Sequence, residues 1–291
     1  MRGTILKKEN KGFVVYCEGE QYFCLARGVI REIANLQAGD EVEFAKDGKI
    51  FVINKLMPRV NQLTRPYISN LTQLIIVIAP LPKPDFLLID KLIIGCEINN
   101  IDPIIVVNKM DIAEIDFYDN VVAQYEHSVE HILKTSATEK QGIEALVALL
   151  ANNLSAFCGQ SAVGKTSLIN AIFKNLNLKT DGLSRKINMG KNTTRHTEIY
   201  VFDNNTFIAD TPGFNMLFHY DIGAENLRDY YYEFNNYAKN CAFKNCSHVN
   251  EEKASCGVKQ AVDSGKVNKD RYERYAGLYK QMKKEEENKY K

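Results

Sequence analysis

The chain has 291 residues, of which 45% are hydrophobic and 25% charged, and its formal net charge is +1. This size and balance are typical of a globular protein with more than one domain and exclude a disordered or fibrous chain. No apolar run approaches the ~18 residues of a membrane span, and the near-zero charge excludes an overall electrostatic attraction to nucleic acid.

Cysteine usage and the first residues of the chain bear on its compartment. The seven cysteines are an odd number, and four of them lie inside apolar runs, where we expect buried thiols: Cys17, Cys24, Cys96 and Cys158. The opening residues contain no apolar segment of the kind found in a signal peptide. We therefore expect a cytoplasmic protein.

Residues 1–62 are predicted to form a small β-barrel of the oligonucleotide-binding (OB) type. The β-rich runs Gly12–Cys17 and Gln21–Ala26 are separated by a short polar turn. The runs Glu41–Ala45 and Lys49–Asn54 flank Lys46-Asp47-Gly48, which is a hairpin signal. Six side chains are available either to RNA or to solvent: Arg2, Lys7, Lys8, Tyr22, Arg27 and Arg31.

The polar segment Met57–Pro66 has a proline near each end and is predicted to be a linker. After it, apolar strands alternate with helical segments, which indicates a doubly wound sheet. The predicted strands are Gln73–Ala79, Pro103–Val107, His131–Lys134, Leu154–Cys158, Ile199–Asp203 and Thr206–Ala209, and the predicted helices are Phe86–Cys96, Phe117–Glu126 and Ile143–Leu150. Ligands of such sheets bind beyond the carboxyl ends of the strands, so the segments at Asn108, Ser136 and Gly159 are expected to converge.

The segment from Gly159 to Ser167 matches the phosphate-binding loop G-x-x-x-x-G-K-[ST], between an apolar strand and a helical pattern. Its glycines let backbone N–H groups surround a phosphate, and the following helix adds its positive N-terminal dipole. Lys165 can reach the β- and γ-phosphates, and the Thr166 hydroxyl can bind Mg²⁺. We assign nucleotide binding to Gly159, Gln160, Ser161, Ala162, Val163, Gly164, Lys165, Thr166 and Ser167.

A second motif, Asn108-Lys109-Met110-Asp111, selects the base. The Asp111 carboxylate can accept hydrogen bonds from N1–H and the 2-amino group of guanine, which adenine lacks. The Asn108 amide can meet N7 and O6, and the Lys109 stem can cover the ring. The motif favours guanine and argues against an ATP-dependent enzyme. Ser136 and Ala137 are expected to reach the same ligand.

Two later segments are expected to complete the triphosphate site. In the polar, basic segment 180–197, Thr193 or Thr194 can supply a second ligand to Mg²⁺. In the segment Asp210-Thr-Pro-Gly213, Asp210 can hold the hydration shell of Mg²⁺, and the Gly213 N–H can contact the γ-phosphate. Of the two threonines we assign Thr194 to Mg²⁺ with Thr166. The predicted catalytic set is Lys165, Thr166, Thr194 and Gly213.

The C-terminal part is predicted to be helical and to bind one structural zinc ion. Segment 224–238 is aromatic, and its rings either form a core or stack on RNA: Tyr230, Tyr231 and Phe234. Three thiols and an imidazole within 16 residues suit tetrahedral zinc, with a disulfide or chance clustering as alternatives: Cys241, Cys246, His248 and Cys256. The basic tail 267–291 carries interleaved tyrosines and either faces RNA or is a solvated helix; it includes Arg271, Tyr272, Arg274, Tyr275 and Tyr279.

With its guanine motif placed before its phosphate loop, the sequence resembles a circularly permuted TRAFAC-class GTPase. Over nearly the whole chain it resembles the small-ribosomal-subunit-dependent GTPase A family. The resemblance implies an α/β P-loop GTPase domain at 63–218, between the OB-type barrel at 1–62 and a zinc-binding domain at 219–291. It implies hydrolysis of GTP to GDP and phosphate, stimulated by the small (30S) ribosomal subunit, in late maturation of that subunit, with rRNA bound by the flanking domains. We expect a monomer that does not bind membranes.

Two departures from the usual motifs concern hydrolysis. Asn192 stands where the family has a histidine, so no side chain is assigned as general base. Phe214 stands where many GTPases have a water-orienting glutamine, which implies slow intrinsic hydrolysis and an activator that completes the site. The alternative hypothesis is an RNA-binding regulatory protein whose nucleotide site is only a switch or a remnant.

Overall fold

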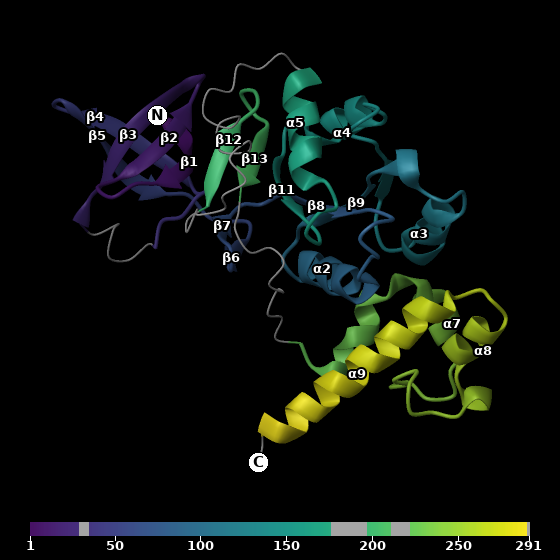
Figure 1. The fold of residues 1–291 in the computed structure, drawn as a ribbon. Coiled ribbons are helices and arrows are strands. Elements are labelled where there is room, and N and C mark those ends of the chain that lie inside the picture. The colour runs from purple at the N-terminus through teal and green to yellow at the C-terminus, as the bar shows by residue number, and fades with distance from the viewer. Residues whose placement is uncertain (29–34, 176–196, 211–221, 290–291) are drawn as a thin grey trace.

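The chain folds into an N-terminal barrel, a central sheet with helices on both faces, and a helical C-terminal module (Figure 1). The structure, a computed structural model, describes residues 1–28, 35–175, 197–210 and 222–289. Among these described residues, no helix is long and apolar enough to cross a bilayer.

The barrel closes in the strand order β1-β2-β3-β5-β4, so the predicted barrel is confirmed. Its interior is filled by inward-facing apolar residues such as Ile5, Val15, Phe44 and Ile53. The first strand was absent from the prediction, because its apolar pair Ile5-Leu6 lies between polar residues. The strands are β1 (Arg2–Lys8), β2 (Phe13–Cys17), β3 (Glu20–Ala26), β4 (Glu41–Asp47) and β5 (Ile50–Leu56).

A short hairpin follows the barrel. Strands β6 (Gln62–Thr64) and β7 (Tyr67–Ser69) pair antiparallel, so the end of the predicted linker is regular structure. The amide of Asn61 bonds both ways with the backbone of Leu71, at 2.7 and 3.0 Å. These two bonds hold the base of the hairpin closed as the chain enters the sheet.

The central sheet has six strands in the order β10-β9-β8-β11-β13-β12, all parallel except β12. Its middle strand β8 is buried along its whole length, as the continuous apolar run predicted. The strands are β8 (Gln73–Ile78), β9 (Asp102–Val107), β10 (His131–Lys134), β11 (Leu154–Cys158), β12 (Glu198–Val201) and β13 (Phe207–Asp210).

Helices cover both faces of the sheet, as a doubly wound fold requires. One face of β8, with Leu74 and Ile76, packs against α2 and α3, and the other, with Ile75 and Val77, packs against α4 and α5. The helices are α2 (Phe86–Ile98), the 3₁₀ turn η1 (Met110–Ile112), α3 (Phe117–Tyr125), α4 (Ile143–Leu150) and α5 (Lys165–Asn175).

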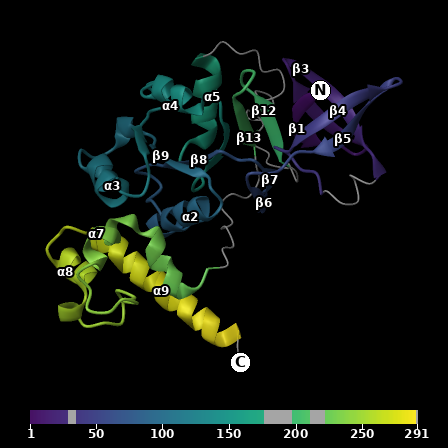
Figure 2. The same cartoon turned by 180° about the vertical axis from the view of Figure 1, so that it is seen from behind.

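The C-terminal module packs against the side of α2 that faces away from the sheet, where Ile94 joins its core. Both views show the long helix α9 running beside α2 (Figures 1 and 2). The elements are η2 (Ala224–Tyr230), η3 (Tyr232–Phe234), α7 (Asn235–Ala238), η4 (Lys253–Ser255), α8 (Gly257–Asp263) and α9 (Lys269–Lys289).

The aromatic segment 224–238, predicted to be helical, is helical in three short pieces. It forms two 3₁₀ turns and a short α-helix, with a break at Tyr231, whose φ is −113° and ψ 77°. The break lets Tyr231 and Phe234 stack with ring centroids 5.4 Å apart inside the core. These two rings are therefore core residues rather than an RNA-stacking surface.

Candidate nucleotide site and Cys3His cluster

The phosphate-binding motif forms a loop at the carboxyl end of β11 and leads directly into α5. Its glycines are required by backbone conformation: φ is +129° at Gly159 and +96° at Gly164. A Cβ at Gly159 would lie 2.1 Å from the Val77 carbonyl oxygen, and one at Gly164 would lie 2.3 Å from Asn108 Nδ2. The loop can approach β8 and the Asn108 side chain only with glycine at both positions.

Lys165 is held inside this loop. Its ammonium donates to the carbonyls of Gly159 at 2.8 Å and Gln160 at 2.7 Å. Burial lowers the pKa of Lys165, although the nearby Cys158 thiol acts in the opposite direction. An anion bound at the loop would stabilise the charged form of this ammonium, as expected of a phosphate-binding lysine. Thr166 and Ser167 follow in the first turn of α5 and are exposed.

The guanine-type motif lies at the neighbouring strand end and is bonded to the phosphate loop. Asn108, which is 1% exposed, donates from Nδ2 to the Val163 carbonyl at 2.9 Å. Its Oδ1 accepts from Thr135 Oγ1 and from the Ala137 N–H, each at 3.3 Å. Asn108 therefore joins all three predicted loops through one side chain.

The carboxylate of Asp111 is exposed at the same edge of the sheet and is oriented by a neighbour. Ser136 Oγ donates to Asp111 Oδ1 at 2.6 Å and accepts from the Glu139 N–H at 3.1 Å. Met110 lies half-buried against the apolar core, and its N–H bonds to the Thr135 carbonyl at 3.1 Å. One Asp111 oxygen is thus fixed by the protein, which limits rotation of the group.

Lys109 closes the outer side of the loop. It adopts a left-handed backbone conformation, with φ of 61°, and donates from Nζ to the carbonyls of Leu81 at 3.0 Å and Ala162 at 2.7 Å. Ser161 and Ala162 are exposed at the loop tip, and Ala162 also has a positive φ, of 65°.

Asp210 ends β13, directly beside β11, at the edge where the phosphate loop begins. It is exposed at this strand end. The other residues predicted to complete the triphosphate site, Thr193, Thr194 and Gly213, lie outside the described residues, as do Asn192 and Phe214.

A second cluster lies in the C-terminal module, where three thiols and an imidazole converge. Their potential ligand atoms all lie within 4.8 Å of one another: Cys241, Cys246, His248 and Cys256. His248 Nδ1 is 3.6 Å from the Cys241 sulfur and 3.5 Å from the Cys256 sulfur. These separations match two ligands of one tetrahedral zinc ion, for which bond lengths near 2.1 and 2.3 Å are expected.

The surroundings of this cluster also suit a metal. Burial lowers the pKa of His248 to about 4, with Arg228 acting in the same direction, so the imidazole is neutral and able to coordinate at neutral pH. All seven cysteines are free thiols, so the disulfide alternative is not seen.

The basic tail does not form the surface that its composition suggested. Arg271 is 2% exposed and Arg274 is partly buried against α2, while the rings of Tyr275 and Tyr279 lie in the core. Both predicted alternatives, an RNA-facing helix and a solvated helix, were therefore wrong for the face of α9 that carries these residues. The buried arginines pair with Asp90, which the sequence prediction did not include. The signal available in the sequence was the presence of this acidic residue inside the apolar run of α2.

The barrel residues proposed for RNA are in part engaged elsewhere. Arg2 pairs with Glu41, Arg27 lies 3.6 Å from Asp47, and Lys7 lies 3.3 Å from Glu198. Tyr22 packs on Phe44 and Phe51, at 5.3 and 4.9 Å between ring centroids. Lys8 is exposed, and Arg31 lies outside the described residues. The exposed aromatic of this strand is Phe23, 48% exposed, which the sequence did not single out.

Comparisons with known proteins agree with this geometry. A family model described as RsgA GTPase matches residues 56–219. The chain is 39% identical over 273 residues to the small ribosomal subunit biogenesis GTPase RsgA of Caldanaerobacter subterraneus, covering 92% of this chain and 91% of that protein. It is 38% identical over 290 residues to the protein of the same name from a Geobacillus species, covering 97% of both.

Solved structures are similar over the same extent. The crystal structure of YjeQ from Thermotoga maritima superposes with a TM-score of 0.81 at 34% identity, covering 97% of this chain and 98% of that one. YloQ, described as a circularly permuted GTPase, superposes with a TM-score of 0.78 at 26% identity, covering 98% and 95%. The permuted order of motifs is thus shared by the fold.

Proposed function

The chain belongs to the RsgA GTPase family and is a GTP-hydrolysing enzyme; on that premise we propose that it acts in late maturation of the small (30S) ribosomal subunit. The observation that carries the proposal is Asn108, whose amide joins the phosphate loop, the guanine motif and the Ser136 loop into one site. The names of its relatives supply the ribosomal context.

We propose that GTP binds across this edge of the sheet. The N–H groups of the phosphate loop and the Lys165 ammonium hold the β- and γ-phosphates. Asp111, oriented by Ser136, accepts from the guanine ring, and the stem of Lys109 covers it. The contacts of Lys109 to Leu81 and Ala162 support this placement, because they set its stem between the two loops.

Magnesium would accompany the nucleotide and neutralise charge between the phosphates. Thr166 at the start of α5 and Asp210 at the end of β13 lie at the same sheet edge and offer oxygen atoms of the kind that Mg²⁺ prefers. Thr194 is the proposed second ligand and Gly213 the proposed γ-phosphate contact. With Phe214 and Asn192 as the neighbouring residues, we propose a low intrinsic rate that the small subunit raises.

The C-terminal cluster would hold one zinc ion with a structural role. Cys241, Cys246, His248 and Cys256 supply a closed set of four ligands, which leaves no open position for catalysis. The ion would join the two ends of a loop that has little secondary structure of its own.

We propose that the flanking modules bind rRNA. On the barrel, Phe23 is the exposed ring on which a base can stack, and Lys8 and Lys11 are exposed cations of the neighbouring turn. A monomer in the cytoplasm fits this role.

A turnover assay tests the proposal. GTP hydrolysis is measured with the protein alone, with purified small subunits and with large subunits as the control. We expect slow turnover alone and a stimulation of about 10³-fold or more by small subunits only. GTP binding without turnover or stimulation would instead favour the RNA-binding protein with a remnant site. Lys165→Ala should abolish turnover and so exclude a contaminating enzyme.

A further inference from the structure

Helix α9 carries two arginines and two tyrosines in the pattern Arg-Tyr-x-Arg-Tyr, from Arg271 to Tyr275. The two arginines contact α2 of the central domain, and the two tyrosines contact the Cys3His loop, defined as residues 241–256. One short stretch of helix therefore joins the central domain to the proposed metal site.

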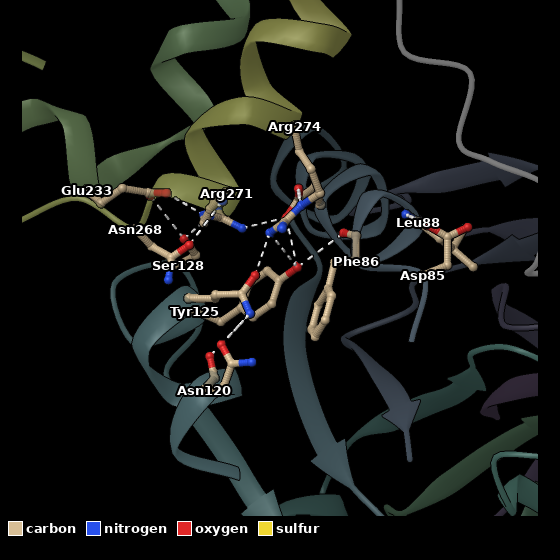
Figure 3. Close-up of polar contacts among 12 residues, drawn as sticks. Asp85, Phe86, Leu88, Asn120, Tyr125, Ser128, Glu233, Asn268, Arg271 and Arg274 are labelled. Atoms are coloured by element: carbon tan, nitrogen blue, oxygen red, sulfur yellow. Dashed lines mark hydrogen bonds and ion pairs between the residues drawn. The ribbon is translucent and has the colours of Figure 1, made fainter. Parts of the chain in front are cut away.

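The arginine contacts form a buried network. Asp90, 1% exposed, accepts from Arg271 Nη1 at 2.7 Å and from Arg274 Nε at 2.5 Å. Arg271 also donates to Ser128 at 2.7 Å and pairs with Glu233. Figure 3 shows Arg271 and Arg274 reaching from α9 towards Tyr125, Ser128 and Glu233. A buried ion pair with this many bonds fixes the orientation of α9 on α2, because breaking it leaves an unpaired charge inside the protein.

The tyrosine contacts reach the backbone of a ligand residue and its neighbour. The Tyr272 hydroxyl donates to the carbonyl of His248 at 2.7 Å, and the Tyr275 hydroxyl donates to the carbonyl of Ser247 at 2.5 Å. His248 has a positive φ, of 60°, so its backbone lies in a region that needs support from its surroundings. These two hydroxyls supply that support from α9.

The N-terminus of α2, close to Asp90, is bonded to the phosphate loop. Gln160 accepts from the Asp85 N–H at 2.9 Å and donates to the Lys83 carbonyl at 3.2 Å. Asp85 caps the N-terminus of α2, accepting from the Leu88 N–H at 3.0 Å. A side chain of the phosphate loop thus fixes the first turn of the helix that carries Asp90.

We propose that α2 and α9 form a bridge through which nucleotide binding at the phosphate loop and metal binding at the Cys3His loop affect each other. Gln160 is the positioning residue at one end, and Tyr272 and Tyr275 are the positioning residues at the other. A nucleotide that orders the phosphate loop fixes Gln160 and the start of α2, and the network at Asp90 passes this constraint to α9. The coupling is reciprocal by thermodynamic necessity.

The consequence reaches an exposed surface. Phe243 lies between the first two cysteine ligands of the Cys3His loop and is 58% exposed, with exposed Lys244 beside it. The nucleotide state would then change how rigidly the Cys3His loop positions Phe243 and Lys244. The proposal rests on the proposed function, because it requires a nucleotide at the phosphate loop.

Zinc release provides the test. The zinc-loaded full-length protein is mixed with a chelating dye, and release is timed without nucleotide, with GDP and with a non-hydrolysable GTP analogue. We expect at least one nucleotide to change the release rate by about fivefold or more. In the double variant Tyr272→Phe/Tyr275→Phe, release should be faster and the nucleotide dependence lost. The matched control Tyr279→Phe removes a hydroxyl one turn further along α9 and should behave as the wild type.

Nucleotide affinity measured in the same samples separates the possible failures. Wild-type protein that binds GTP but releases zinc at one rate in all three states overturns the bridge and leaves the proposed function intact. An unchanged nucleotide effect in the double variant also overturns it. Protein that binds no guanine nucleotide overturns the proposed function and the bridge together. In the reverse measurement, zinc removal should change nucleotide affinity by the same factor by which that nucleotide changes the equilibrium affinity for zinc. A nucleotide affinity that does not change contradicts the proposal.

Discussion

The carboxylate of Asp111 is the group that we propose selects the base. Ser136 holds one of its oxygens at 2.6 Å, so the carboxylate presents a fixed acceptor at the edge of the sheet. Guanine offers two donors to such an acceptor, and a base without them leaves the charged group unsatisfied. In the proposed site, the orientation of this carboxylate, which lies outside the phosphate loop, therefore sets the choice of base.

Replacing Asp111 by Asn should change the preferred base from guanine to xanthine. The amide offers a donor where the carboxylate offered an acceptor, which suits the 2-carbonyl of xanthine. We expect GTP affinity to fall by about tenfold or more, and XTP to bind better than GTP. Competition against a fluorescent guanine nucleotide measures both. Ser136→Ala, the control, should weaken GTP without favouring XTP, and unchanged GTP binding by Asp111→Asn would contradict the base-reading role.

Tyr231 presents the opposite situation, a polar atom with nothing to bond. Its ring lies between Phe234, Tyr275 and Arg271, but its buried hydroxyl has no hydrogen-bond partner among the described residues. Burial raises its pKa well above the usual value, so the group is neutral and only its desolvation counts.

Tyr231→Phe should therefore stabilise the protein by about 1 kcal/mol, because it removes a desolvated hydroxyl and keeps the ring. Tyr125→Phe is the contrasting variant, since its hydroxyl donates to Asp90 at 2.9 Å, and it should be destabilising. The midpoint of denaturant unfolding measures both changes. Destabilisation by Tyr231→Phe would show that the hydroxyl has a partner.

Among the elements, α9 is the longest helix of the described chain, and it carries a glycine without a structural reason for one. Gly277 is exposed, has no positive φ, and has no neighbour within 4 Å of the place where a Cβ would lie. A glycine in a helix interior costs conformational entropy that alanine does not.

We expect Gly277→Ala to raise the free energy of unfolding by about 0.5–1 kcal/mol, as measured by thermal or denaturant unfolding of the C-terminal module. Gly164→Ala provides the contrast. Its φ of +96° and the 2.3 Å approach to Asn108 mean that the same substitution should strain the phosphate loop and reduce nucleotide binding. Destabilisation by Gly277→Ala would mean that α9 is bent or packed at that position.

The elements that the sequence predicted well are those whose signals are local. Strand β8 is buried at every position and gave a continuous apolar run, and the phosphate loop needs its glycines within one short segment. The break at Tyr231 and the burial of Arg271 depend instead on partners far along the chain, 181 residues away in the case of Asp90. A basic residue near an aromatic one is as typical of an RNA-binding surface as of a buried contact, so the two cannot be told apart until the tertiary partner is known.

At the scale of the whole molecule, the protein has several cores rather than one. The barrel and the C-terminal module each enclose their own apolar cluster, and the two clusters share no residue. Two of the four proposed zinc ligands, Cys246 and Cys256, belong to the buried cluster of the C-terminal module. Loss of the ion should therefore destabilise that module before the barrel or the sheet.

Removing zinc with a chelator should unfold the Cys3His loop while the barrel and the sheet stay folded. Hydrogen exchange should show lost protection over residues 241–263 and unchanged protection in β8 and β5. Adding back zinc should restore protection, and adding Mg²⁺ should not. Equal exchange with and without the chelator would mean that the cluster binds no structural ion.

The contact between the barrel and the edge of the central sheet has a consequence for folding during translation. Tyr16 in β2 bonds to Asn204, 188 residues later, and its ring meets Phe207 edge-on, at 5.8 Å between centroids. During synthesis the barrel leaves the ribosome and can close long before β12 and β13 exist. The contact with β12 and β13 can form only after more than two thirds of the chain has been translated. A nascent chain stopped before residue 198 should therefore carry a closed barrel that lacks its contacts with β12 and β13.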